Sequence, residues 1–173
     1  MFTNRARILV IGAFVIMQAV AINYKVYEIA GVTAMFILLL IWGYFKEGTI
    51  VLAAKAFHNK DYSKAEGLLQ QVANPDWLSK KRRGFYEFIY GGVCLQKLDY
   101  DEAEKHYEIA AQYPLRTAND HVAALVHVAN ISIRHNDFAK AKAYLALADK
   151  YEEKITSKMK DVVQRLHKEL DKK

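Results

Sequence analysis

The sequence predicts an all-α protein: an N-terminal transmembrane helical hairpin, an α-solenoid of three repeats, and a C-terminal capping helix. Three features predict this fold class. Two uncharged apolar runs lie before residue 46, a six-residue pattern occurs three times at a spacing of 38 residues, and an apolar stripe lies on one face of an otherwise charged C-terminal segment. With 53% hydrophobic residues, two prolines and one cysteine, the composition excludes collagen-like, disordered and disulfide-stapled chains.

The first two helices are expected from residues 8–22 and 29–45, which carry no charged side chain. Each run is near the lower limit of the roughly 17–25 residues that cross a bilayer core. Residues 23–28 separate the runs and are too few for a folded loop. We therefore expect a tight hairpin of two transmembrane helices that forms a membrane anchor over residues 1–46.

Basic residues set the expected orientation of this hairpin. Arg5 and Arg7 precede the first run and Lys46 follows the second, whereas the turn holds only Lys25, opposed by Glu28. Because basic flanks stay on the cytoplasmic side, we expect an integral multi-pass membrane protein, in the inner membrane if bacterial, with a cytoplasmic soluble domain. Two alternatives stay open: the first run is a cleavable signal peptide, or both runs are buried core helices.

The next segment is expected to consist of repeated helix pairs. An aspartate followed by an aromatic residue, with an alanine four positions after the aspartate, occurs three times at one spacing, and each occurrence lies between two stretches of helical apolar periodicity. The aspartate is expected to cap the second helix, the ring to lie between the paired helices, and the alanine to mark their closest approach. These occurrences begin at Asp61, Asp99 and Asp137.

Residues 47–151 resemble tetratricopeptide repeats (TPRs). The resemblance rests on a small residue midway along each first helix, an alanine in each second helix, and Pro114 after the second helix of the middle repeat: Ala53, Gly91 and Ala129, then Ala65, Ala103 and Ala141. Two departures are a spacing of 38 rather than 34 residues, and Glu87 in place of a large apolar residue. The resemblance implies three stacked TPR-like helix pairs whose first helices line a concave face.

That face, through the resemblance, is the expected binding site for an apolar peptide or an amphipathic helix of another protein. Its alternative is that three repeats curve too little to expose a groove and that these side chains form core. The groove candidates are mainly apolar and aromatic, with a basic edge: Ile50, Phe57, Phe85, Phe88, Ile89, Leu95, Gln96, Val126, His127, Asn130 and Arg134.

Residues 152–173 are expected to form a C-terminal capping helix and tail. The apolar residues share one face of an otherwise charged segment, and a terminal helix of this kind covers the open end of a solenoid. The stripe consists of Ile155, Met159, Val162, Val163, Leu166 and Leu170.

Catalytic, cofactor-binding and metal-binding groups are not expected. The pair Gly91 and Gly92 lies inside a helix, no two histidines stand four residues apart, and Cys94 lies at a packing position. We therefore expect no enzyme, no cofactor and no metal site.

The sharpest charge cluster is Lys80, Lys81, Arg82 and Arg83. It is either a solvated helix end or, next to a bilayer tether, a contact with anionic lipid headgroups. The small basic surplus after residue 45 does not favour nucleic acid as a partner.

The sequence therefore predicts a membrane-anchored TPR adaptor or scaffold that binds a protein partner through its groove and membrane lipid through its two transmembrane helices. The alternative is an accessory or assembly subunit of a larger membrane protein complex, held through the hairpin. Self-association into a homo-oligomer is also open, because an apolar groove on a short array favours it.

Overall fold

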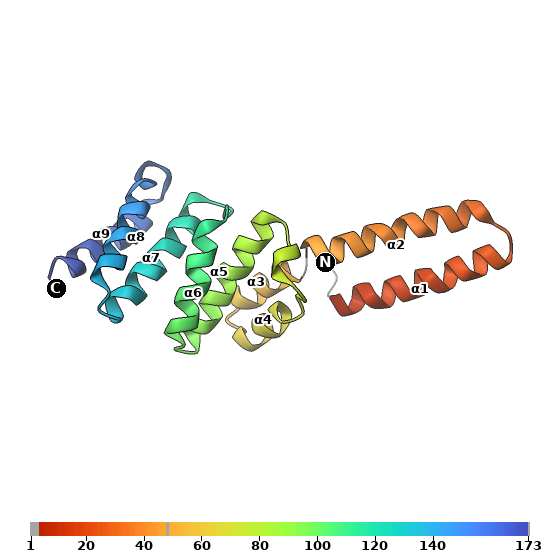
Figure 1. Ribbon diagram of the computed structural model, residues 1–173, viewed down its shortest axis with the longest axis horizontal. Coiled ribbons are helices and arrows are strands. Elements are labelled where there is room, and N and C mark those ends of the chain that lie inside the picture. Colours follow the sequence, from red (N-terminus) through yellow and green to blue (C-terminus); the bar gives the residue numbers. More distant parts are fainter. Residues whose placement is uncertain (1–3, 48, 173) are drawn as a thin grey trace. The chain divides into compact units, whose positions relative to one another are not determined.

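The computed structural model describes the backbone of residues 4–47 and 49–172, and within them all regular secondary structure is helical (Figure 1). The helix-rich arrangement is that of a repeat-like α-solenoid. The elements are α1 (Asn4–Asn23), α2 (Tyr27–Glu47), α3 (Ile50–His58), α4 (Tyr62–Leu69), η1 (Pro75–Trp77), α5 (Lys80–Gln96), α6 (Tyr100–Gln112), α7 (Ala118–Arg134), α8 (Phe138–Asp149), η2 (Glu152–Lys154) and α9 (Ser157–Leu170).

The chain divides into two compact units, Met1–Ser79 and Lys80–Lys173. The first holds the α1–α2 and α3–α4 pairs, and the second holds α5 to α9. The division into an anchor at 1–46, repeats at 47–151 and a cap at 152–173 stays a prediction about domain organisation.

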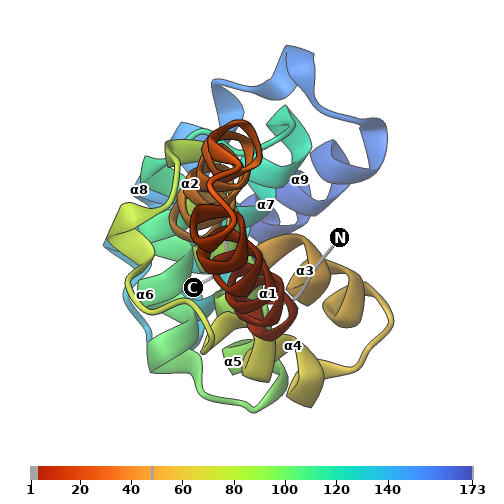
Figure 2. The same cartoon turned by 90° about the vertical axis from the view of Figure 1, so that its right-hand side faces the viewer.

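Helices α1 and α2 form the expected tight hairpin, and both views show them side by side (Figures 1 and 2). The rings of Phe14 and Phe36 stack across it with centroids 5.9 Å apart. Ala21 and Ala30 are buried because their small side chains let the two helices approach. Lys25 turns the chain with φ of 57°.

The prediction that this hairpin crosses a membrane is wrong. No helix in the part of the chain that the structure describes is long and apolar enough to span a bilayer. The physical reason is that charged residues at the helix ends shorten the apolar part of each helix: at a rise of 1.5 Å per residue, the uncharged runs 8–22 and 29–45 extend about 22 Å and 25 Å, against a hydrocarbon core of about 30 Å.

The prediction of an integral, multi-pass membrane protein is therefore also wrong, and the orientation deduced from these runs no longer applies. The residues on which the orientation rested, Arg5, Arg7 and Lys46, have side chains that lie outside the described residues.

Each of the three repeat turns has the same backbone geometry. The residue before the aspartate has a positive φ, and the aspartate N–H donates to the carbonyl five residues back, which is the Schellman ending of a helix. The aspartate side chain then accepts from the N–H three residues ahead and caps the next helix. The positive-φ residues are Lys60 (60°), Leu98 (64°) and Asn136 (61°), and the caps are Asp61 to Lys64 (3.2 Å), Asp99 to Glu102 (3.2 Å) and Asp137 to Lys140 (3.0 Å).

The expected close approach at the repeat alanines is confirmed. Ala65, Ala103 and Ala141 are all fully buried, one in each second helix. A larger side chain at any of them would push the paired helices apart, because protein interiors are close-packed.

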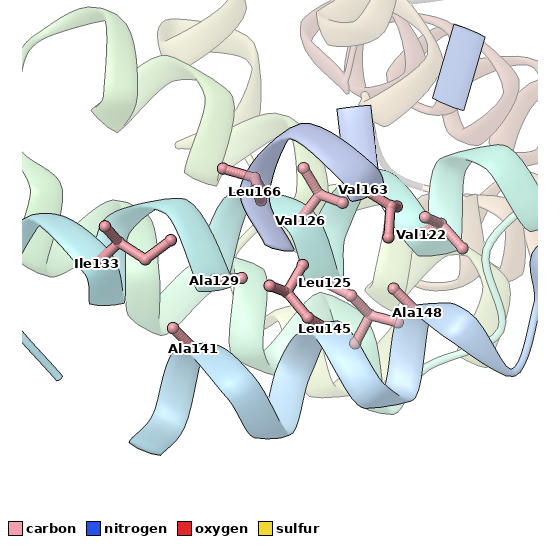
Figure 3. Packing of buried hydrophobic residues seen from close by; sticks show 10 residues of the cluster. All are labelled: Val122, Leu125, Val126, Ala129, Ile133, Ala141, Leu145, Ala148, Val163 and Leu166. Carbon is pink, nitrogen blue, oxygen red and sulfur yellow. The ribbon is translucent and has the colours of Figure 1, made fainter. Parts of the chain in front are cut away.

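The second unit has two apolar clusters. One joins α5, α6 and α7 around Tyr107, Val128 and Ile131. The other joins α7, α8 and α9, and Figure 3 shows ten of its side chains packed together. All six residues of the predicted C-terminal stripe belong to or pack against this second cluster, so α9 covers the outer side of the α7–α8 pair.

Candidate partner-binding surface

Three rings from three successive helices lie in a row in the second unit. Phe88 of α5 meets Tyr107 of α6 edge to face, with ring centroids 5.7 Å apart, and His127 of α7 stacks on Tyr107 at 4.4 Å. Tyr107 is buried, whereas Phe88 and His127 are half-buried. Phe88 and His127 therefore present apolar ring surface to solvent over a buried Tyr107.

Gly91 explains how the Tyr107 ring fits against α5. A Cβ at residue 91 would lie 3.1 Å from Cγ of Tyr107. The absence of a side chain there lets the ring lie directly on the helix backbone. This is the packing reason for the small residue that the sequence places midway along the first helix of the repeat.

The rings of this row are uncharged at neutral pH. Burial raises the pKa of Tyr107 well above its usual value and lowers the pKa of His127 from 6.5 to about 4. A neutral, aromatic surface of this kind suits apolar side chains better than ions.

A basic residue lies at the C-terminal end of α7. The Arg134 guanidinium lies 5.2 Å from the ring centre of Tyr100, and its Nη1 donates to the Tyr100 hydroxyl at 3.4 Å. Arg134 is exposed. Its contact with an aromatic ring fixes its direction while leaving its charge in water.

The predicted groove residues fall into three groups by exposure. Of the eleven, two belong to the first unit, Ile50 and Phe57, and nine belong to the second. Buried side chains contribute to core rather than to a surface, so the surface candidates are the half-buried and exposed ones. Buried are Ile50, Ile89 and Val126; half-buried are Phe57, Phe85, Phe88, Leu95, His127 and Asn130; exposed are Gln96 and Arg134.

The cluster Lys80 to Arg83 is split by the structure. Lys80 and Lys81 are exposed, whereas Arg82 and Arg83 are half-buried. Nη2 of Arg83 lies 2.9 Å from Oε1 of Glu87, one helical turn away. The expected contact with lipid headgroups also rested on a transmembrane tether next to this cluster. Because the predicted spans are wrong, the tether no longer supports that expectation.

Glu87 is the main charged group whose environment the sequence did not predict. It is 2% exposed, and its carboxylate lies between Arg83 and Nδ1 of His106, at 2.5 Å from the latter. The His106 ring stacks on Tyr90 at 4.4 Å. A buried carboxylate needs such partners, but His106 lies nineteen residues away in the chain, beyond the reach of local patterns.

A second polar cluster joins α6, α7 and α8 around Glu104. Its Oε1 accepts from the Ser132 hydroxyl at 2.6 Å and lies 3.0 Å from Nζ of Lys140, which is 2.5 Å from Glu108. Desolvation acts to raise the pKa of Glu104, but the bonds from Ser132 and Lys140 outweigh it and hold the pKa below its usual value. The cluster fixes how these helices meet.

Within residues 4–47 and 49–172, no group of three His, Cys, Asp or Glu side chains is placed to hold a metal ion. The one cysteine, Cys94, is buried in the core of the second unit.

Comparison with known proteins gives no relative: no family model, no curated protein and no solved structure matches the chain.

Proposed function

We propose that this chain is a TPR-like adaptor that binds a protein partner, through an apolar peptide or amphipathic helix, and has no catalytic activity of its own. The observation that supports it best is the row of Phe88, Tyr107 and His127. It comes from three successive helices and leaves two half-buried rings at the surface. Aromatic groups held by a rigid scaffold are typical anchors for a partner's apolar side chains.

The repeat geometry gives a second, independent support. The three turns each have a positive-φ residue, an aspartate cap and a buried alanine at equivalent positions, which indicates equivalent helix pairs. In stacked helix pairs the first helices lie next to one another, which gives an extended surface for a peptide or a helix. In the second unit the first helices of the pairs are α5 and α7, and both contribute side chains to one apolar cluster.

The test is an affinity purification of the tagged full-length chain and of two glutamate variants. Phe88→Glu places a carboxylate in the ring row, and Leu147→Glu makes the same charge change at a residue of α8 that is 41% exposed and outside the row. We expect a discrete partner protein with wild type and with Leu147→Glu, and its loss with Phe88→Glu, because an unpaired carboxylate is costly in an apolar interface.

Gln96→Glu is the safeguard against misfolding, because Gln96 is exposed and its replacement removes no core contact. A weakened partner with Gln96→Glu, together with an unchanged helical circular dichroism spectrum, supports the proposal. A partner retained equally by the Phe88 and Gln96 variants would overturn it.

A second candidate is an accessory subunit of a protein complex, held through the α1–α2 hairpin. One observation favours it: large apolar side chains of the hairpin are exposed, among them Leu9 (75%), Ile16 (69%) and Leu38 (67%). Contiguous exposed apolar surface usually marks an interaction site. Replacement of residues 8–45 by an unrelated helical hairpin would abolish association in this case and leave it intact if the ring row carries the binding.

A further inference from the structure

The second unit holds an open surface pocket of about 530 Å³, and none of Phe88, Tyr107 and His127 lines it. Its walls come from the end of α6, the α6–α7 loop, the first turn of α7 and the η2 turn. The polar and aromatic residues among its lining are Gln112, Tyr113, Arg116, Thr117, His121, Tyr151 and Lys154. The volume lies within the range of small-molecule sites.

Two local interactions hold the walls in place. The Thr117 hydroxyl accepts from the N–H of Asp120 at 3.1 Å and caps α7. Oδ1 of Asn119 accepts from the N–H of Thr156 at 3.0 Å, which ties the segment after η2 to the start of α7. The cavity is therefore a product of the fold and not of one loose loop.

The charge on the walls has one sign. Arg116 and Lys154 are both exposed cations, and no aspartate or glutamate is among the lining residues. Asp120 and Glu152 are close in sequence but do not line the cavity. Fixed guanidinium and ammonium groups without a lining carboxylate favour an anionic ligand.

The other lining residues include two rings, with planes at 52° to each other, and several apolar side chains. The rings of His121 and Tyr151 lie with centroids 5.0 Å apart, and Ala111, Pro114 and Leu115 add apolar surface. Burial lowers the pKa of His121, so this ring is uncharged at neutral pH. Aromatic and aliphatic walls next to two cations combine ring stacking with charge recognition.

We propose that this cavity binds a small aromatic anion, in which a phosphate or a carboxylate meets Arg116 and Lys154 and the ring lies against His121 and Tyr151. This proposal does not rest on the proposed partner surface, because none of the ring-row residues lines the pocket. The two anion types share the same recognition chemistry, and the experiment distinguishes them.

The experiment is isothermal titration calorimetry of the full-length chain with four probes: phenyl phosphate, benzoate, inorganic phosphate and the neutral benzyl alcohol. We expect phenyl phosphate or benzoate to bind about tenfold more tightly than both inorganic phosphate and benzyl alcohol, because only they use both walls. Whichever of the two binds more tightly identifies the anion.

Variants then locate the binding. Arg116→Gln and Lys154→Gln each remove one charge and are expected to weaken the tighter probe about tenfold. Lys150→Gln removes an exposed lysine outside the cavity and should leave the affinity unchanged. Equal affinity for benzyl alcohol, or unchanged affinity in both cavity variants, would overturn the proposal, as would the absence of measurable heat with every probe.

Discussion

Acidification should destabilise this protein through one ring of the row, His127. Its pKa is lowered from 6.5 to about 4 in the folded chain because burial disfavours the imidazolium. Below pH 6.5 the unfolded chain takes up a proton that the folded chain does not. The stability is therefore complete above pH 6.5 and is lost progressively as the pH falls towards 4.

The magnitude follows from the two pKa values. Between pH 8 and pH 5 the free energy of unfolding should fall by about 2 kcal/mol through His127 alone. His127→Phe isolates this contribution, because a phenyl ring can keep the stack on Tyr107, which lies at 4.4 Å, but cannot take up a proton.

The assay is urea unfolding of the full-length chain at pH 8 and pH 5, followed by circular dichroism. Hydrogen exchange of α7 amides identifies the transition that belongs to the second unit. Other titrating groups, including Glu104 and His121, contribute equally to both proteins, so only the difference is interpreted. Wild type should lose about 2 kcal/mol more than His127→Phe. Equal losses of unfolding free energy in both proteins would refute the reasoning, because they would mean that His127 is accessible to solvent and not stacked on Tyr107.

Three further predictions concern packing and turns, each measured as the change in urea midpoint of the full-length chain. Leu98→Asn should raise the free energy of unfolding by about 1 kcal/mol, because Leu98 is 69% exposed and has a φ of 64°, which asparagine adopts more readily than leucine. The equivalent position of the third repeat is Asn136. No gain in stability would show that the Leu98 turn is not strained. Glu87→Gln should lower the free energy of unfolding by about 2 kcal/mol, because half-buried Arg83 loses its counter-charge; a neutral effect would mean that this ion pair does not contribute. Gly84→Ala should destabilise the protein by about 1–2 kcal/mol, since the new Cβ would lie 2.7 Å from Cβ of Tyr113. Gly67→Ala should stabilise it by about 0.5–1 kcal/mol, because no atom lies within 4 Å of the new Cβ. A stability change of the same sign at both sites would contradict the described packing.

The repeat turns could be predicted from the sequence because their causes are local. An aspartate that caps a helix acts over three residues, and an alanine at the helix crossing is required by sterics alone. These features repeat at Asp61, Asp99 and Asp137, and the structure has all three caps. The C-terminal stripe from Met159 to Leu170 could be predicted for the same reason, since its period is that of the single helix α9; Ile155 lies before α9, which begins at Ser157.

Predictions that depend on a length threshold, or on residues far away in the chain, were less successful. The apolar runs of the hairpin predict transmembrane spans, but each is near the lower length limit, and no described helix is long and apolar enough to cross a bilayer. Asn74 and Pro75 have the pattern of a helix start, but they start only the short η1, and α5 begins at Lys80. A proline pre-sets only the first turn, and the residues that follow decide whether a helix continues.

Helical periodicity also cannot tell which neighbour a residue faces. Ile89 and Val126 have the spacing expected of a groove, yet both are buried, while Phe88 and His127 are only partly buried. The partner of Glu87 came from the next helix, which no local pattern could supply.

The measurement that tests the central claim most directly is site-specific photo-crosslinking from the proposed surface. A photoreactive phenylalanine analogue at exposed Gln96 of α5 is compared with the same analogue at Leu147 of α8, in full-length chain in its native cells. The adaptor proposal predicts a discrete crosslinked protein from residue 96 and none from residue 147. No crosslink from residue 96, or the same product from both positions, would contradict it.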